Sequence, residues 1–248
     1  MPSRMAQELA GADLHLHTRY SDGVLSVDQL LDRVLELGYL SVIAVTDHDT
    51  IRGGFAARER SAQRGLPLEV VVGVEVNTLW GHLIVLYVED QVPSLRPLPS
   101  TIATIHRLDG LCIIPHPFAF WVPSVGRRVL RKLRSLGPEY TPVGIEAFAG
   151  FNARLDDPDL SSFARVGGSD AHMAAQVGAR YTMFKGSTAQ DLRRCLLEGE
   201  TLPARGKPPS AWQFASNAVE ITLRSLVATP SRVASQALGT QWKPRQKA

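Results

Sequence analysis

The chain has 248 residues, of which 44% are hydrophobic and 21% charged, the balance of an ordinary globular domain rather than a disordered chain. No apolar run approaches the roughly 20 residues that a membrane-spanning helix requires. The net charge of +3 is uneven, because residues 203–248 carry a net +6 and leave −3 for residues 1–202. These features exclude a membrane-spanning protein, and residues 1–202 show no sign of a surface built to bind polyanions.

The first ten residues lack the apolar segment of a signal peptide, so we expect a cytoplasmic protein. Cys112 and Cys195 lie in apolar or helical contexts, and we expect them to be buried, reduced thiols. The sequence indicates no obligate protein partner.

Short apolar runs rich in β-branched residues alternate with amphipathic stretches along the chain. In chain order the pattern predicts a strand at 12–16, a helix at 27–37, a strand at 41–46, a helix at 54–64, strands at 69–74 and 82–88, a helix at 100–108, a strand at 111–115, a helix at 125–136, strands at 143–147 and 164–168, and a helix at 188–198. Ser26 and Gly38 suit the two caps of the first helix. The alternation favours a mostly parallel sheet covered by helices, and seven strands favour a distorted (β/α) barrel over an open doubly wound sheet.

One connection is too short for that pattern. Only six residues, 76–81, separate Glu75 from His82, whereas a parallel return needs about 10–12 residues or more. We therefore expect an antiparallel hairpin that brings Glu75 and His82 to the same end of the sheet.

A second part of the chain follows the barrel. The segment 204–210 holds Lys207, Pro208 and Pro209 and reads as a boundary. We expect residues 1–203 to form the catalytic barrel and residues 204–248 to form a helical, basic extension that is partly disordered. Residues 212–227 are the candidate helix of this extension. Such a tail is either a solvated extension or a contact for nucleic acid or an acidic partner.

Histidines and carboxylates gather at one end of the predicted strands, the C-terminal end where catalytic loops of a (β/α) barrel collect. Those at strand ends are His15, His17, Asp47, His48, Asp49, Glu75, His116, Asp170 and His172, and His82 opens the antiparallel strand at the same end. A single histidine in such a place is usually a packing residue, but six in register indicate a common purpose.

The residue types point to metal ions. His15 and His17 are two positions apart on an extended segment, so both imidazoles face the same side and can meet one cation. A carboxylate between two cations can bridge them, and Glu75 and Asp170 are the candidates. Mixed imidazole and carboxylate ligands suit Mn²⁺, Fe²⁺ or Zn²⁺. Neighbouring ions of this kind activate water and hold the oxygens of a phosphoryl group.

The same residues carry a resemblance to a known family. The strings DLHLHTRYSDG at 13–23, TDHDT at 46–50, GVE at 73–75, Pro-His-Pro at 115–117 and GSDAH at 168–172 resemble the successive motifs of the PHP superfamily of polymerase-associated and histidinol-phosphatase domains. The resemblance covers residues 12–185 and implies a distorted seven-stranded (β/α) barrel with a site for two to three divalent transition-metal ions.

The resemblance also implies a ligand set. One metal would take His15, His17, Glu75 and Asp170, a second would share Glu75 and add His82 and His116, and a third would take Asp22, His48 and His172. The Asp22 variant of the motif resembles the branch that acts on small phosphoesters and nucleotides. We predict catalytic roles for His48, His172 and Asp170, with His48 or His172 as the proton donor.

The implied function is hydrolysis of a phosphate monoester of a nucleotide or other small phosphorylated metabolite by metal-activated water. Residues 89–110 leave no room for a separate cap domain, so an exonuclease or phosphodiesterase acting on short oligonucleotides is the first alternative. Histidinol phosphatase activity and a non-catalytic metal-binding domain are the others.

Other polar residues carry weaker signals. His106 lies in a predicted helix and is expected to be a packing or surface histidine. Asp47 and Asp49 flank His48: either one of them orients an imidazole or Asp49 caps the following segment, and Glu146 either supports the site or does not reach it. The arginines that suit phosphate, each with surface exposure as its alternative, are Arg19, Arg127, Arg154 and Arg180.

Overall fold

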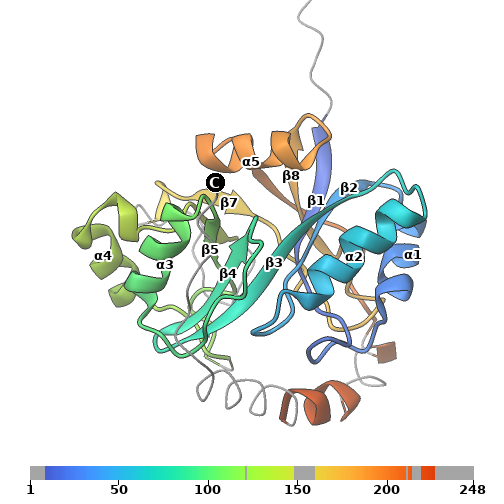
Figure 1. Ribbon diagram of the computed structural model, residues 1–248, viewed down its shortest axis with the longest axis horizontal. Coiled ribbons are helices and arrows are strands. Elements are labelled where there is room, and N and C mark those ends of the chain that lie inside the picture. The colour runs from blue at the N-terminus through green and yellow to red at the C-terminus, as the bar shows by residue number, and fades with distance from the viewer. Residues whose placement is uncertain (1–8, 121, 148–159, 211, 214–218, 227–248) are drawn as a thin grey trace, which may run out of the picture.

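All seven predicted strands form, and two further strands join them in one mixed sheet. The computed structural model describes residues 9–120, 122–147, 160–210, 212–213 and 219–226 (Figure 1). The strands are β1 Leu9–Leu16, β2 Leu40–Val45, β3 Glu69–Thr78, β4 Gly81–Leu86, β5 Leu111–Ile114, β6 Gly144–Glu146, β7 Ala164–Val166, β8 Arg180–Lys185 and β9 Leu202–Arg205. The α-helices with assigned bounds are α1 Val27–Leu37, α2 Arg52–Gln63, α3 Leu98–Arg107, α4 Arg127–Leu136 and α5 Ala189–Glu198, and a 3-10 turn spans Pro138–Tyr140.

The sheet curves into a nearly closed barrel. Its order is β7-β6-β5-β4-β3-β2-β1-β8-β9. The two ends of this order approach each other, since Thr182 on β8 exchanges hydrogen bonds with Gly167 just after β7, and Thr201, just before β9, donates to the carbonyl of Arg165. The barrel predicted from the sequence is therefore confirmed.

The expected strand number and direction need correction. β8 and β9 were missing from the prediction, and both pair antiparallel, β8 with β1 and with β9. Together with the antiparallel β4, they make half of the eight strand pairs among the described residues antiparallel, so the sheet is mixed rather than mostly parallel. The parallel sets β1-β2-β3 and β5-β6-β7 still end at one mouth.

The hairpin after Glu75 is confirmed and is tighter than expected. β3 continues to Thr78 and β4 begins at Gly81, so the turn between the two strands has only two residues, Leu79 and Trp80. Asn77 faces His82 across the ladder. Gly81 has φ +121°, and a Cβ there would collide with the backbone of Ser124, so this turn requires glycine.

Helices cover the outside of the barrel on two sides and close one end (Figure 1). α1 and α2 pack on β2 and β3, and α3 lies over β4 and β5. Phe184 of β8 packs among apolar residues of β1, β2, β4, β5 and α5 inside the barrel. α5 lies at the end opposite the mouth, so polar side chains are left to fill the mouth itself.

The first helix has the caps that its sequence predicts. Ser26 Oγ accepts a hydrogen bond from the backbone N–H of Gln29, whose side chain in turn accepts from Ser26 N, and Gly38 adopts φ +71° at the C-terminus. These caps fix where α1 begins and thus how the loop 18–26 returns from the mouth.

Of the predicted extension 204–248, residues 204–210, 212–213 and 219–226 are described; β9 runs on to Arg205, and residues 212–213 and 219–226 are helical. Residues 242–248, the predicted basic end, lie outside the described residues. Within the described part of the chain, no helix has both the length and the apolar character needed to cross a bilayer.

Candidate metal centre

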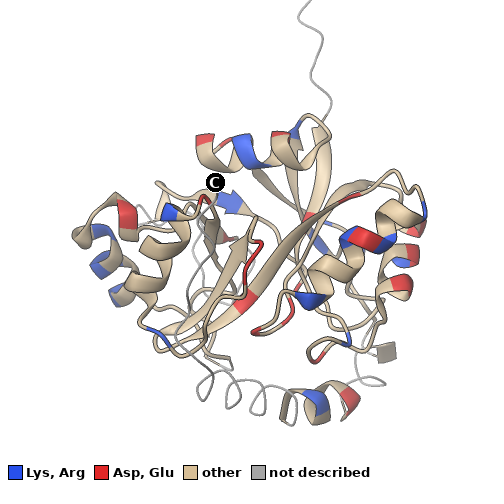
Figure 2. Ribbon diagram, viewed as in Figure 1, with Lys and Arg blue, Asp and Glu red and all other residues tan. Residues whose placement is uncertain are grey.

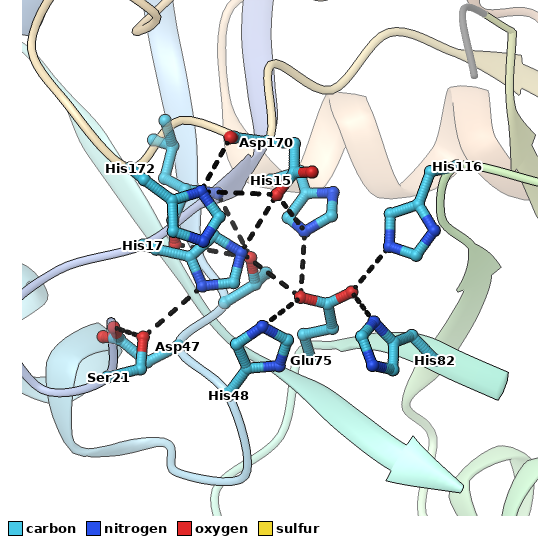
Figure 3. A network of polar contacts seen from close by, with 12 residues as sticks. His15, His17, Ser21, Asp47, His48, Glu75, His82, His116, Asp170 and His172 are labelled. Atoms are coloured by element: carbon cyan, nitrogen blue, oxygen red, sulfur yellow. Dashed lines mark hydrogen bonds and ion pairs between the residues drawn. The ribbon is translucent and has the colours of Figure 1, made fainter. Parts of the chain in front are cut away.

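The predicted histidines and carboxylates converge at the mouth of the barrel (Figure 3). His15 and Glu75 lie on β1 and β3, His82 is the second residue of β4, and the other members follow the ends of β1, β2, β5 and β7. His17 and His15 are fully buried, and Glu75 is 1% exposed. Six imidazoles and three carboxylates therefore share one small volume. Along the sequence they extend from His15 to His172, a separation of 157 positions.

Glu75 stands at the centre of this cluster with its two oxygens facing different histidines. Oε2 lies 3.2 Å from both His15 Nε2 and His17 Nε2 and 3.4 Å from His48 Nε2. Oε1 lies 2.9 Å from His82 Nδ1 and 3.0 Å from His116 Nε2. This is the arrangement expected of a carboxylate that bridges two cations. The closeness of His82 to Glu75 is what the hairpin predicted.

Asp170 completes the group around His15 and His17. Its Oδ1 lies 3.3 Å from the Nε2 atom of each imidazole. With Glu75, these residues form one of the groups whose ligand atoms all lie within 4.8 Å of one another. The Asp170 side chain is 37% exposed, so this group opens toward solvent on the Asp170 side.

The predicted third group also comes together. Asp22 Oδ2 lies 3.3 Å from His172 Nε2 and 3.7 Å from His48 Nε2. His17 belongs to this group as well, with its ring stacked on that of His172 at a centroid distance of 4.2 Å. His48 lies close to both Glu75 and His82, so His17 and His48 each stand between two groups that the predicted ligand set keeps separate.

Glu146, at the end of β6, supports this centre. Its Oε1 lies 2.8 Å from His15 Nδ1, and its Oε2 accepts a 2.7 Å hydrogen bond from the backbone N–H of His116. A carboxylate behind an imidazole fixes the ring orientation and leaves the other nitrogen free to bind a cation. Glu146 thus bonds both the His15 ring and the His116 backbone. Of the two interpretations left by the sequence, it supports the site rather than failing to reach it.

Asp47 holds the turn that carries Asp22. It accepts hydrogen bonds from Thr18 N and Oγ1, both at 2.7 Å, and from Ser21 Oγ at 2.6 Å. Ser21 Oγ lies 3.4 Å from His17 Nδ1, so Asp47 reaches that imidazole through Ser21. Asp47 therefore acts on the loop first and on the imidazole only indirectly.

Asp49 and Asp13 tie neighbouring segments together. Asp49 accepts from both the backbone and the side-chain amide of Asn77, at 2.9 and 2.5 Å. The fully buried Asp13 accepts from the backbone N–H groups of Ser169 and Gly178, at 3.0 and 2.9 Å. The first bond joins the loop after β2 to β3, and the second pair joins β1 to the loop that carries Asp170.

Two of the predicted ligands have a strained backbone conformation. His116 and Asp170 have φ +28° and +53°, in the left-handed region that costs a non-glycine residue about 1 kcal/mol or more. Gly168 passes so close to Glu146 Oε1 and the His15 Cβ that a side chain there would overlap both. The motif at 168–172 therefore requires glycine at position 168 for packing.

The carboxylates of the centre are strongly acidic. Despite burial, the imidazoles around them hold the pKa values of Glu75, Asp170 and Asp22 far below their ordinary range. No lysine or arginine among the described residues forms an ion pair with these three carboxylates in the structure. Their counter-charge must therefore come from protonated imidazoles or from metal ions.

The imidazoles divide into two kinds. At His15, His116 and His17 burial disfavours the charged form, but the carboxylates outweigh it and raise the pKa of His17 to about 10. At His48 burial prevails and lowers the pKa to about 3. In the absence of metal, His15, His17 and His116 therefore hold protons.

The residues present fit metal ions. Several buried ring and carboxylate atoms have no well-directed hydrogen bond within the described residues, namely His17 Nε2, Asp22 Oδ1, His48 Nδ1 and His82 Nδ1. The short distances around Glu75 thus occur without matching hydrogen-bond geometry at His17 and His82. Atoms that converge in this way, with mixed N and O donors, suit a transition-metal cation between them.

The remaining predicted residues lie outside the cluster or beyond the described residues. His106 is on α3, where burial lowers its pKa, and Arg19 donates to the carbonyl of Val24. The Arg127 guanidinium lies 4.6 Å from the Phe118 ring centroid, and Arg180 begins β8. Arg154 lies outside the described residues, so none of these four arginines is placed on a phosphate site.

The sequence did not point to Ser124 or Ser225. Ser124 Oγ lies 3.0 Å from His116 Nδ1 and donates to the His116 carbonyl. Ser225 Oγ lies 2.8 Å from Asp22 Oδ2. Neither serine belongs to a motif, so only the folded chain brings them to the centre.

Known proteins match this chain over its motifs. Residues 13–122 match the PHP domain family, and residues 161–201 match the PHP-associated family. An uncharacterized protein of Methanocaldococcus jannaschii is 34% identical over 129 residues, which are 48% of this chain and 74% of that protein.

Two relatives have named activities. The 3′,5′-nucleoside bisphosphate phosphatase of Chromobacterium violaceum is 36% identical over 63% of this chain, and the 5′-3′ exoribonuclease Rnm of Salmonella typhimurium is 39% identical over 34% of it. The matches span about half of the phosphatase (49%) and 30% of the exoribonuclease.

A solved structure agrees on the fold. A two-domain protein of Bacteroides vulgatus, described as containing a predicted PHP-like metal-dependent phosphoesterase, superposes with a TM-score of 0.61 over 88% of this chain and 70% of that protein, at 14% identity. The matching domain families, the barrel and the motif residues gathered at its mouth agree. The chain therefore belongs to the PHP domain family.

Proposed function

We propose that this PHP-domain protein is a metal-dependent phosphoesterase that hydrolyses a phosphate monoester of a nucleotide or another small phosphorylated metabolite. The observation that carries the proposal is Glu75, whose two oxygens face separate sets of imidazoles at 2.9–3.4 Å. Two or three Mn, Fe or Zn ions in such a centre would supply Lewis acidity, lower the pKa of water and offset the charge of a phosphate.

The residues of the centre would hold the ions, orient the ligands and admit the substrate. His15, His17, Glu75 and Asp170 would hold one ion, Glu75 with His82 and His116 a second, and Asp22, His48 and His172 a third. Glu146 keeps His15 oriented through Nδ1, so that Nε2 points into the centre. Asp170, the most exposed of the three central carboxylates, stands where a substrate enters.

We assign proton donation to His172 rather than His48. Burial lowers the pKa of His48 to about 3, so this imidazole carries no extra proton at neutral pH. The His172 side chain is 15% exposed, and its Nδ1 lies 3.0 Å from the Asp170 carbonyl oxygen. Because the same imidazole is also a ligand of the proposed third ion, it can donate a proton only in a form of the centre that holds two ions.

The relatives support small phosphoesters first and oligonucleotide ends second. The bisphosphate phosphatase of Chromobacterium violaceum matches a larger part of this chain than the exoribonuclease Rnm does. The second candidate function, exonucleolytic cleavage of short oligonucleotides, is supported by several exoribonucleases that match over the motif-bearing part of the chain. Both reactions would use the same centre.

The deciding experiment is turnover by the full chain loaded with Mn²⁺. The substrates are a nucleoside 3′,5′-bisphosphate, histidinol phosphate and a 5′-phosphorylated tetranucleotide, with phosphate release and chain shortening measured separately. His17→Ala should lose metal and turnover together, and His106→Ala, which changes a histidine outside the centre, should lose neither.

The outcomes distinguish the phosphatase, the exonuclease and the non-catalytic metal-binding domain. Phosphate release from the small monoesters alone supports the proposal, whereas chain shortening of the tetranucleotide supports the exonuclease. Bound metal without any turnover would leave a non-catalytic metal-binding domain. A folded His17→Ala protein with full metal content and activity would refute the assigned centre.

A further inference from the structure

The helical stretch 219–226 lies at the mouth of the barrel, although it follows the last strand in sequence (Figure 1). Ser225 Oγ lies 2.8 Å from Asp22 Oδ2 and donates its hydrogen bond to that carboxylate. Asp22 Oδ2 is the oxygen that faces His48 and His172, at 3.7 and 3.3 Å. The extension therefore touches the centre at a ligand atom of the predicted third metal.

This stretch faces the barrel with a mixed side. Ser225, Arg224 and Ile221 are half-buried, whereas Val219, Leu223 and Leu226 are 70, 58 and 67% exposed. A helix packed on a protein normally buries its apolar stripe, but here most apolar residues stay exposed. The hydroxyl–carboxylate bond between Ser225 and Asp22 is the polar contact of this stretch with the centre.

A second observation places residues 210–213 of the extension on the same side of the mouth. Ser210 and Gln213 exchange reciprocal backbone-to-side-chain hydrogen bonds, as in a helix capping box. Gln213 lines a surface pocket together with Val24 and Met173. Those two residues belong to the loops that carry Asp22 and His172, so Gln213 faces both loops of the third group across this pocket.

The two sides of the mouth consequently differ. The Asp170 side chain is 37% exposed, whereas Asp22 is 2% exposed beneath Ser225. A substrate can approach from the Asp170 side, but a chain that continues past the Asp22 side would meet residues 219–226. The covering is local, because only Ile221, Arg224 and Ser225 among the described residues 219–226 are part-buried.

We propose that residues 219–226 form a lid over the Asp22–His48–His172 group that restricts the centre to small or terminal phosphoesters. The lid supplies the covering that residues 89–110 are too short to provide. Its role in selecting substrates rests on the proposed phosphoesterase function, but its attachment through Ser225 does not. Longer nucleotide chains enter only when the Ser225–Asp22 bond opens.

The test uses the full chain with Mn²⁺ and two variants of the lid. Ser225→Leu removes the hydroxyl and adds bulk against Asp22, and Leu223→Ala changes the same helix on its exposed side as the matched control. Amide hydrogen exchange of residues 219–226 reports the lid itself. The ratio of kcat/KM for a 5′-phosphorylated tetranucleotide to that for a nucleoside 3′,5′-bisphosphate reports selection, and fluorescence anisotropy gives the affinity of a labelled tetranucleotide.

Ser225→Leu should speed exchange across 219–226 and raise both the kcat/KM ratio and the tetranucleotide affinity by about three- to tenfold, the range for one charge-assisted hydrogen bond at a partly exposed site. Leu223→Ala should leave all three near wild type. Unchanged exchange in Ser225→Leu would show that the bond does not hold the lid. Faster exchange with an unchanged ratio and affinity would show that the lid does not select substrates.

Failure of the proposed function has a different signature. It would appear as absent turnover of both substrates by the metal-loaded wild-type protein. Hydrogen exchange and tetranucleotide affinity would then still decide whether residues 219–226 cover the centre.

Discussion

Replacing Glu146 by glutamine should weaken metal binding without touching a predicted ligand. The carboxylate accepts two hydrogen bonds, from His15 Nδ1 and from the His116 backbone N–H. A glutamine amide has one acceptor and one donor, so it can satisfy only one of these partners. If it keeps His116, its NH₂ group faces His15 Nδ1 and favours the tautomer that carries hydrogen on Nε2.

That tautomer opposes metal binding, because His15 Nε2 is the atom that faces Glu75 and Asp170. Loss of a carboxylate behind a ligating imidazole typically costs 10- to 100-fold in metal affinity. We therefore expect Glu146→Gln to raise the Kd of the most affected ion by about 10- to 100-fold, equivalent to about 1.4–2.7 kcal/mol.

The assay is competition between the protein and a chelating indicator for Mn²⁺, analysed for each ion that binds. Glu89→Gln is the control, since it makes the same chemical change at an exposed glutamate paired with Arg58. Circular dichroism establishes that both variants remain folded. A Kd within twofold of wild type in a folded Glu146→Gln protein would refute the supporting role of Glu146.

Four further predictions concern the centre and the barrel. Glu75→Gln removes the charge between the two imidazole sets, so bound metal and kcat should fall together, kcat by about 10²-fold or more; full metal content measured by mass spectrometry would contradict this. Asp47→Asn weakens the turn held by Thr18 and Ser21, and calorimetry should show a loss of about 2 kcal/mol, or about 4–8 °C in Tm. Burial disfavours charge on His17, but Asp170 and Glu75 raise its pKa to about 10; this stabilisation of the metal-free protein is full below the unfolded pKa near 6.5 and is lost as pH rises toward 10. Tm measured from pH 6 to 10 should therefore fall in the metal-free protein and fall less in the Mn²⁺-loaded protein. Equal slopes of Tm against pH in the two forms would contradict a stabilising role of protonated His17. Phe184→Ala should cost about 3–5 kcal/mol in urea unfolding, since this buried ring of β8 fills the barrel, and a cost below 1 kcal/mol would show that the ring does not pack there.

Charge is distributed in keeping with a metal centre. Figure 2 shows Lys and Arg on the outer helices, including α4 and α5, while Asp and Glu occur in the loops at the mouth. The buried charges of Glu75 and Asp22 are therefore offset by the protonated imidazoles around them or by metal ions that replace those protons.

The barrel was predictable as far as local patterns reach. Strands β1 to β7 are short apolar runs, and Ser26 and Gly38 cap α1 as their residue types indicate. β8 and β9 were missed because their outer residues are polar or half-exposed, as in Arg180–Lys185, and β9 contains Pro203. Their extended form comes from pairing with β1 and with each other, which no local window contains.

The sequence by itself determined the chemistry of the centre. Strand ends, the two-residue spacing of His15 and His17 and the short hairpin after Glu75 place these side chains at one mouth, since side-chain direction in a strand is a local property. Tertiary structure alone decided that each Glu75 oxygen faces a different imidazole set, that Glu146 holds His15, and that Ser225 reaches Asp22. Apart from the His82–Glu75 contact within the hairpin, those contacts join residues 58 to 203 positions apart, and their geometry depends on how the curved sheet and its loops pack together.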